Sequence, residues 1–124
     1  MINAKSNFDS VLRKYGHDVL LQRHLNSNSY SSKLEKFTVR DQYPRKAGLS
    51  GVEELSKSGI NYNVDMIYYF QSEANPRERD RIYESDTRYP SGYTTYVIDY
   101  ALALRADGGF IAYWTCGVTR EIPA

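Results

Sequence analysis

The first hydrophobic pattern in the chain has the period of a helix. Apolar side chains recur at intervals of three and four residues, which places them along one helical face. They are Phe8, Val11, Leu12 and Tyr15. Ser6 is suited to cap the start of the helix, and Gly16 to end it in the left-handed conformation. The pattern therefore predicts a short helix with its cap over residues 6–16, which must dock on the rest of the domain to be stable.

After this helix the hydrophobic period changes to two, which is typical of half-buried β-strands. Residues 17–25 and 34–42 both alternate in this way, and the polar residues 26–32 between them favour a turn. The first of these strands is expected to bury one apolar face. That face carries Val19, Leu21 and Leu25.

The clearest strand patterns lie in the second half of the chain. Residues 64–70, 93–105 and 110–120 alternate, and residues 81–83 predict a short edge strand. Asp107-Gly108-Gly109 is a strong hairpin signal between the last two strands. One face of 93–105 is expected to carry Tyr96, Ile98, Tyr100, Leu102 and Leu104. In 110–120, two faces alternate. One carries Phe110, Ala112, Trp114, Cys116 and Val118, and the other Ile111, Tyr113, Thr115 and Thr119.

These patterns predict a mainly β protein, a small β-barrel or sandwich of about five or six strands with a short N-terminal helix and a long loop. A chain of 124 residues fits a single domain, 1–124. The barrel is expected to use residues 17–42 and 63–121, and the loop residues 43–62. A connection of this length suggests either a mobile surface insertion or a loop that reaches a partner.

Composition narrows the class without naming a function. The 16 basic and 15 acidic residues leave a formal net charge of +1, so the whole chain lacks the strong basic charge of many nucleic-acid-binding domains. The single cysteine excludes an intrachain disulfide. No stretch of the sequence approaches the length of a membrane span, and the start lacks a signal-peptide pattern. We expect a soluble protein made in the cytoplasm.

The sequence contains no pattern that marks an enzyme, a cofactor site or a metal site. The two histidines, His17 and His24, are seven residues apart, which on a regular strand places them on opposite faces. Cys116 lies in the middle of an apolar strand face and is expected to be a buried packing residue. Nucleophile elbows, phosphate-binding glycine loops and zinc-protease motifs are absent from the sequence. No carboxylates stand in the pattern of a tuned acid–base pair.

Twelve tyrosines favour strands and also favour protein interfaces. Three of them, Tyr69, Tyr93 and Tyr113, fall opposite the more apolar face of their strands. They are candidates for subunit contacts, unless the helix or a second sheet covers them within the domain. A second interpretation is a barrel that stacks single-stranded nucleic acid on exposed aromatics. Most tyrosines, however, share a strand face with aliphatic residues, which favours a role in the core.

Residues 8–23 join a short helix, a glycine and a strand of the form Asp-Val-apolar-apolar-polar-Arg. This opening resembles that of the head-closure (stopper) connector proteins of tailed bacteriophages. In that family a proline turn leads to a short Asp-Arg-Ile strand, here Pro76 and Asp80-Arg81-Ile82. A Tyr-x-Val/Ile strand then leads through a glycine hairpin into an aromatic strand, here residues 96–98 and 108–121. The family's usual glycine before Asp-Arg-Ile is replaced by Arg79, so we expect a different turn there.

The resemblance implies a structural virion neck protein and not an enzyme. Such proteins are β-barrels that form a ring of six or twelve copies. One side of the ring contacts the portal and adaptor, and the other contacts the tail terminator. Assembly takes place in the host cytoplasm. An extended loop points to the central channel and helps to retain packaged double-stranded DNA, which it contacts without reading its sequence. The loop residues concerned here are Arg45, Lys46, Leu49, Val52, Glu53, Glu54, Leu55 and Lys57. An adaptor or tail-terminator role is the alternative within the same setting, although such adaptors are commonly helical. No cofactor and no membrane contact are implied.

Overall fold

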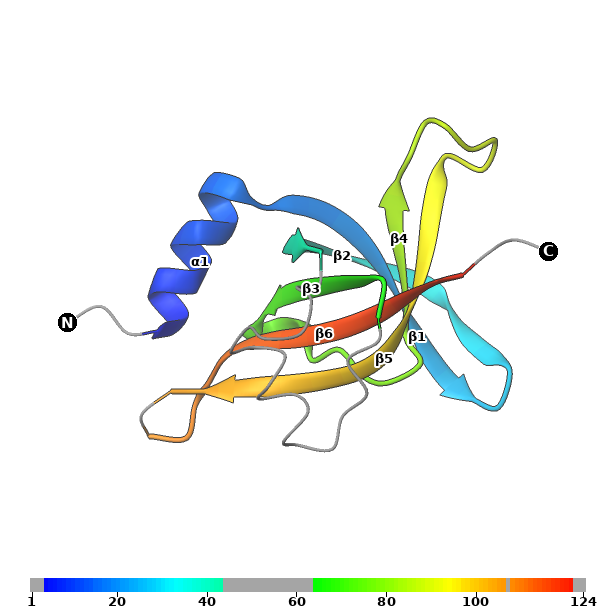
Figure 1. The fold of residues 1–124 in the computed structure, drawn as a ribbon. Helices are drawn as coiled ribbons and strands as arrows, with labels where there is room; N and C mark the ends of the chain where they lie inside the picture. The colour runs from blue at the N-terminus through cyan, green and yellow to red at the C-terminus, as the bar shows by residue number, and fades with distance from the viewer. Residues whose placement is uncertain (1–3, 44–63, 107, 122–124) are drawn as a thin grey trace.

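The computed structural model describes residues 4–43, 64–106 and 108–121. Their strands form one closed antiparallel barrel in the order β1-β2-β3-β6-β5-β4, with a single α-helix beside it (Figure 1). The elements are α1 (Ala4–Tyr15), β1 (His17–Asn26), β2 (Ser29–Gln42), β3 (Met66–Gln71), the 3₁₀ helix η1 (Ser72–Ala74), β4 (Arg81–Ser85), β5 (Tyr93–Arg105) and β6 (Ile111–Glu121). The prediction of a mainly β fold with a short N-terminal helix is confirmed, and of the two predicted forms, barrel or sandwich with about five or six strands, the structure has the closed barrel with six. The described part of the chain contains no helix long and apolar enough to cross a lipid bilayer.

Closure of the barrel gives β4 two neighbours. The sequence predicted an edge strand here, but β4 pairs with β1 through residues 20–22 and 81–83, and with β5 along its whole length. The edge prediction is therefore wrong. The reason is that closure removes both edges of a sheet, which no pattern within one short strand reports.

The core fills the inside of the barrel. β3 and β6 supply it as their alternation predicted: Met66 pairs with Val118 and Phe70 with Trp114, side by side on the inner face. The side chains with almost no exposed surface form one cluster. They are Val19, Leu21, Val39, Met66, Tyr68, Phe70, Ala74, Ile82, Ile98, Cys116 and Val118.

A β-bulge changes the faces of β5. Ile98 pairs with Val118 but Tyr100 pairs with Gly117, so Asp99 is the extra residue of the bulge. Tyr96 and Ile98 face the core, and after the bulge the inward position passes to Ala101. The prediction that one face carries all five large apolar residues is wrong from Tyr100 onward, because one inserted residue reverses the alternation.

The β1–β2 hairpin is longer than predicted. Both strands continue through the polar stretch and leave a turn of two residues at 27–28, where Ser27 has a positive φ of 36°. The register shifts beyond Gln22, and Leu25 is 62% exposed. The expectation of a buried Leu25 is therefore wrong, because the bulges in β1 end the simple alternation that buries Val19 and Leu21.

The helix α1 also differs from its prediction at both ends. It begins at Ala4, so Ser6 lies inside the helix and is not its cap. Gly16 does not adopt a positive φ. Its N–H instead donates to the carbonyl of Leu12 at 2.9 Å, which continues the helical bonding. Tyr15 at the last helical position is 62% exposed, whereas Leu12 is buried.

Candidate functional site

The loop residues that the resemblance singled out lie outside the described residues. Arg45, Lys46, Leu49, Val52, Glu53, Glu54, Leu55 and Lys57 all fall in residues 44–63. The two strands that flank this segment, β2 and β3, are neighbours in the barrel and pair through residues 39–42 and 67–70. The prediction for the loop therefore stays a prediction.

The three candidate interface tyrosines occupy two places. Tyr113 and Tyr69 lie together on the outside of the barrel, with ring centroids 6.1 Å apart. The ring of Phe8 from α1 stacks on Tyr113 at 4.5 Å, so the helix covers part of this pair. Tyr93 is separate, 41% exposed, and packs edge-on against Tyr83. The helix α1 thus covers Tyr113 within the domain, whereas Tyr93 stays exposed.

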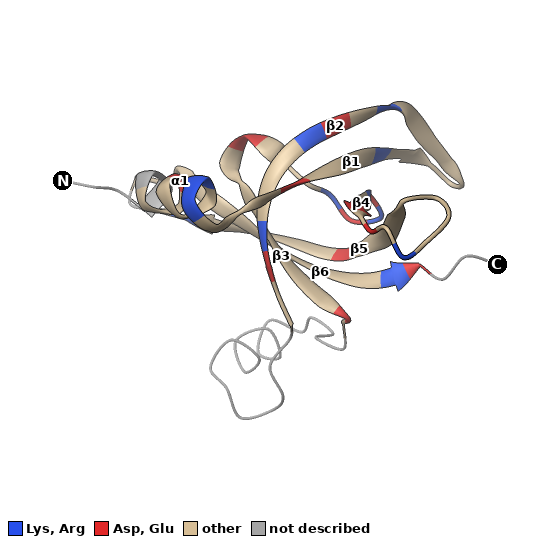
Figure 2. Cartoon of the chain, turned by 90° about the horizontal axis from the view of Figure 1, so that it is seen from above, with Lys and Arg blue, Asp and Glu red and all other residues tan. Residues whose placement is uncertain are grey.

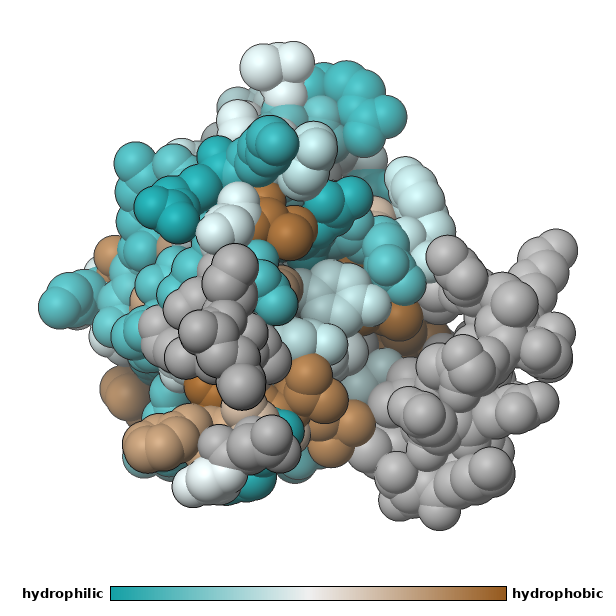
Figure 3. All heavy atoms as spheres, turned by 90° about the vertical axis from the view of Figure 1, so that its left-hand side faces the viewer, coloured by the Kyte–Doolittle hydropathy of each residue, from teal (hydrophilic) through white to brown (hydrophobic). Residues whose placement is uncertain are grey.

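The hairpin between β5 and β6 carries two exposed apolar side chains that the sequence pattern did not predict as a surface. Leu104 and Phe110 lie at the turn between β5 and β6 and are 45% and 74% exposed. We call these two residues the hairpin patch. Apolar side chains also gather on the lower part of the face shown in Figure 3, the side of the molecule on which α1 and this hairpin lie. Leu104 was expected on the core side, and the bulge at Asp99 is what turns it outward. Phe110 was expected on the same face as Ala112, which is wrong, because β6 begins only at Ile111 and Phe110 belongs to the turn.

Arg23 and Asp80 join the two segments that carry the resemblance. Asp80 is 2% exposed and accepts bonds from the backbone N–H groups of His24, at 2.8 Å, and Arg77, at 3.0 Å. The guanidinium of Arg23 contacts Asp80 at 3.3 Å, binds Glu35 at 2.7 Å, and donates to carbonyls of the β3–β4 connection. Burial of a carboxylate is costly unless the group is paired and hydrogen-bonded, as it is here. The pair therefore ties the start of β4 to β1.

The turn before β4 keeps a conformation that glycine favours. Arg79 has a φ of 77°, in the left-handed region, and its N–H donates to the carbonyl of Ile98 at 2.8 Å. The expectation that this turn differs from that of the connector family stays a prediction. The side chain differs from glycine, but the φ angle is one that glycine adopts without strain.

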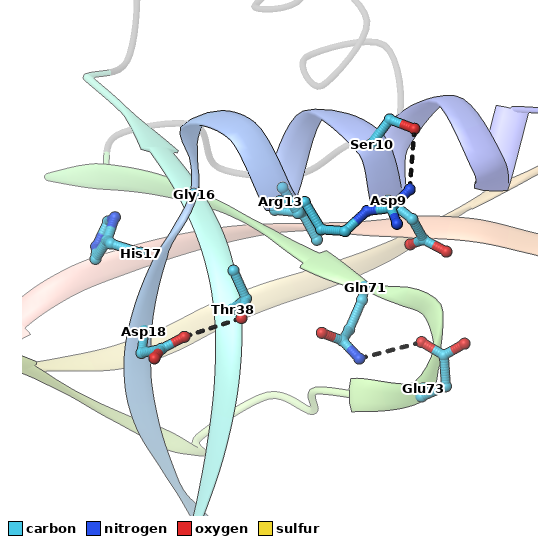
Figure 4. Close-up of a pocket in the computed structure, with 10 residues that line it drawn as sticks. Asp9, Ser10, Arg13, Gly16, His17, Asp18, Thr38, Gln71 and Glu73 are labelled. Atoms are coloured by element: carbon cyan, nitrogen blue, oxygen red, sulfur yellow. Dashed lines mark hydrogen bonds between the residues drawn. The ribbon is translucent and has the colours of Figure 1, made fainter.

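A polar groove runs between α1 and the start of β1, with a volume of about 730 Å³ (Figure 4). Asp18 in this groove accepts a hydrogen bond from Thr38 at 2.9 Å, which, together with Lys36, lowers the pKa of Asp18. Gln71 donates to Glu73 at 3.3 Å across the groove floor. These groups satisfy one another, as is usual on a solvated surface.

A second polar cluster lies at the end of the barrel where β1 begins. His17, Asp41 and Glu84 come from β1, β2 and β4, and one potential ligand atom from each lies within 4.8 Å of the other two. We call these three residues the His17 cluster. Nε2 of His17 is 2.5 Å from Oε1 of Glu84. The contact lacks hydrogen-bond geometry, so this buried nitrogen has no hydrogen-bond partner among the described residues.

Tyr68 supports this cluster from inside the core. Its hydroxyl donates to Oε2 of Glu84, and its side chain is fully buried. Burial raises the pKa of Tyr68, and the bond to Glu84 raises it further. The phenol therefore stays protonated at neutral pH and holds the carboxylate in place.

Cys116 is confirmed as a packing residue. It is fully buried in the core, and burial raises the pKa of its thiol. A nucleophilic cysteine needs an accessible thiolate, which this environment disfavours.

The fold and these surfaces define a closed, filled β-barrel with a helix on its side. No protein-family model, no curated protein and no solved structure matches the chain. The class of the protein therefore rests on its fold and on its own residues.

Proposed function

We propose that this protein is a structural ring-forming connector of the stopper type in the neck of a tailed bacteriophage. The observation that carries the assembly part of the proposal is the exposed hairpin patch, Leu104 and Phe110. Both belong to the hairpin between β5 and β6, and exposed large apolar side chains in one region of a surface favour an interaction site. The neck setting rests on the resemblance of residues 8–23 and 80–82 described above.

The Arg23–Asp80 pair supports treating those two segments as one unit. The arginine closes the Asp-Val-apolar-apolar-polar-Arg motif of β1, and the aspartate opens the Asp-Arg-Ile motif of β4. They are 57 residues apart in sequence and meet at 3.3 Å, with Asp80 buried and Arg23 partly exposed. The last residue of the β1 motif and the first residue of the β4 motif are thus partners in one interaction.

The charge distribution suits a protein that packs against copies of itself. Lysine, arginine, aspartate and glutamate are interspersed over the barrel (Figure 2). Several cations are paired within the chain, for example Arg81 with both oxygens of Glu121 at 2.9 Å. In a closed ring, one face of each copy contacts a different face of the next copy. Such contacts are favoured when electrostatic repulsion between the copies is small.

The alternatives fit less well. Adaptors of phage necks are commonly helical, whereas the described chain is mainly β. A barrel that stacks single-stranded nucleic acid needs aromatic rings bordered by uncompensated cations. The guanidinium of Arg81 lies 4.0 Å from the ring of Tyr30, but its charge is balanced by Glu121.

The hairpin patch offers a direct test of assembly. The chain, mixed with portal and adaptor proteins of a tailed bacteriophage, is expected to form rings visible by electron microscopy and native mass spectrometry. Phe110→Asp should prevent ring formation, because it places a charge in the apolar contact. Leu25→Asp is the matched control, since Leu25 is also exposed but lies at the tip of the β1–β2 hairpin.

A wild-type chain that stays monomeric and never joins purified necks would overturn the proposal. So would equal effects of the two substitutions. The role in DNA retention is tested separately by deleting residues 48–59. Filled heads that leak DNA would support the loop's role, and heads that keep their DNA would refute that role alone.

A further inference from the structure

Three strands bring one potential metal ligand each to the same end of the barrel. His17 opens β1, Asp41 stands one residue before the end of β2, and Glu84 lies in β4. Each is two residues from an inward-facing core residue of its own strand: Val19, Val39 and Ile82. Alternation therefore points all three toward the barrel axis. The set is held by the barrel and not by a loop.

The distances within the His17 cluster are close to those of a metal site. Zinc binds imidazole nitrogen and carboxylate oxygen at about 2.0–2.2 Å, which places tetrahedral ligand atoms about 3.4 Å apart. Here Nε2 of His17 lies 2.5 Å from Oε1 of Glu84, and one ligand atom from each of the three residues lies within 4.8 Å of the other two. Small side-chain rotations that separate the first pair and bring Asp41 inward would suffice.

Within the described ranges, the two carboxylates of the cluster, Asp41 and Glu84, have no lysine or arginine as an ion-pair partner. Like charges at this separation repel, and a cation between them would remove the repulsion. The buried Nε2 of His17, which has no hydrogen-bond partner among those residues, is a nitrogen available for coordination.

The surroundings provide orientation and access. Tyr68 donates to Oε2 of Glu84, an arrangement typical of the hydrogen bonds that orient metal ligands. Asp41 and Glu84 also line a polar pocket of about 330 Å³ at the barrel end, and His17 lines the groove beside α1. An ion in solution thus has a route to the cluster.

We propose that His17, Asp41 and Glu84 bind a divalent transition-metal ion of the zinc class. Imidazole is a ligand for zinc, nickel and copper, whereas magnesium and calcium prefer oxygen alone. The sequence pattern predicted no metal site, because the spacing of His17 from the other histidine, His24, is unsuitable for one. The partners of His17 are carboxylates 24 and 67 residues further along the chain, on neighbouring strands.

Such an ion would link β1 to β4, the two neighbouring strands that share the shortest run of paired residues in the barrel. β1 pairs with β4 only through residues 20–22 and 81–83. A metal bound by His17 and Glu84 would join the same two strands beyond that ladder, and Asp41 would add β2. The proposal does not depend on ring formation, so either can fail while the other stands.

The test measures zinc binding to the full-length, tag-free chain after treatment with a chelating resin. Isothermal titration and native mass spectrometry should find one zinc ion per chain, and the midpoint of thermal unfolding should rise with zinc. His17→Gln and Asp41→Asn should each weaken binding at least about tenfold. Tyr68→Phe should weaken binding about 10–100-fold while retaining all three ligands.

Two controls separate this site from general binding by histidine or carboxylate. His24→Gln changes the other histidine, near the far end of β1, and Asp18→Asn removes a neighbouring exposed carboxylate. Both should bind zinc like the wild type. Circular dichroism confirms that each variant is folded. No binding by the folded wild type, or equal binding by the wild type and both ligand variants, would overturn the proposal.

Discussion

At the scale of single residues, Arg79 shows how backbone conformation can oppose side-chain identity. In the described part of the chain, three non-glycine residues have positive φ: Ser27, Asn75 and Arg79. Asparagine tolerates this region because its short side chain bonds locally, but arginine has no such compensation. The side chain of Arg79 is exposed, and the hydrogen bonds of this residue use its backbone N–H and carbonyl groups. The native turn is therefore held by its backbone contacts.

Arg79→Gly is expected to stabilise the protein. Glycine adopts a φ of 77° without the steric conflict of Cβ, which should raise the free energy of unfolding by roughly 0.5–1 kcal/mol. Urea unfolding measures the change. Arg77→Gly is the control: Arg77 is also exposed but lacks a positive φ, so the same replacement should be destabilising. A loss of stability in Arg79→Gly would contradict the account of this turn.

At the scale of elements, the junction between α1 and β1 depends on a close approach of two backbones. A Cβ placed on Gly16 would lie 2.6 Å from the carbonyl oxygen of Leu12 and 2.8 Å from that of Val39. Neither atom belongs to a flexible side chain. The glycine that was predicted to end the helix in a left-handed conformation is thus required for a different reason: the chain between α1 and β1 lies against the backbone of β2.

Gly16→Ala is expected to destabilise the protein by about 2–3 kcal/mol, since either the helix or the barrel must shift. Denaturant unfolding would measure the loss, and hydrogen exchange should show weaker protection in α1. The comparison is Asn7→Ala, an exposed position in the same helix, which should change stability by less than about 0.5 kcal/mol. Equal stability of Gly16→Ala and the wild type would show that the close approach can relax.

At the scale of the whole molecule, the barrel buries several phenols. Burial is the largest cause that raises the pKa of Tyr68, Tyr96 and Tyr100, the last to about 12. The folded protein therefore keeps these protons to a higher pH than the unfolded chain, whose tyrosines ionise near pH 10. Stability from this source is fully present below about pH 10 and is lost as pH rises toward 12 and beyond.

The free energy of unfolding should therefore fall between about pH 10 and pH 12. Urea titrations across this range, with tyrosinate absorbance recorded in parallel, would measure it. Tyr100→Phe should show a smaller fall, because one of the shifted groups is removed. A free energy of unfolding that stays constant over this pH range would contradict the linkage.

The candidate surface residues differ in whether the sequence pattern could identify them. Tyr93 could be found from alternation alone, because its strand begins regularly. Leu104 could not, because the bulge at Asp99 reverses the faces before the chain reaches it. The pairing of Arg23 with Asp80, and of His17 with Asp41 and Glu84, needs the positions of strands that are distant in sequence.

The sequence alone determined the mainly β class, the N-terminal helix and the glycine hairpin, because these follow from hydrophobic period and backbone preference within a few residues. Tertiary structure decided which strands became neighbours, where the bulges fell, and which polar groups met at the barrel end. Those outcomes depend on strands that close on one another over long stretches of chain, and residue spacing along one strand carries no record of its partner across the barrel.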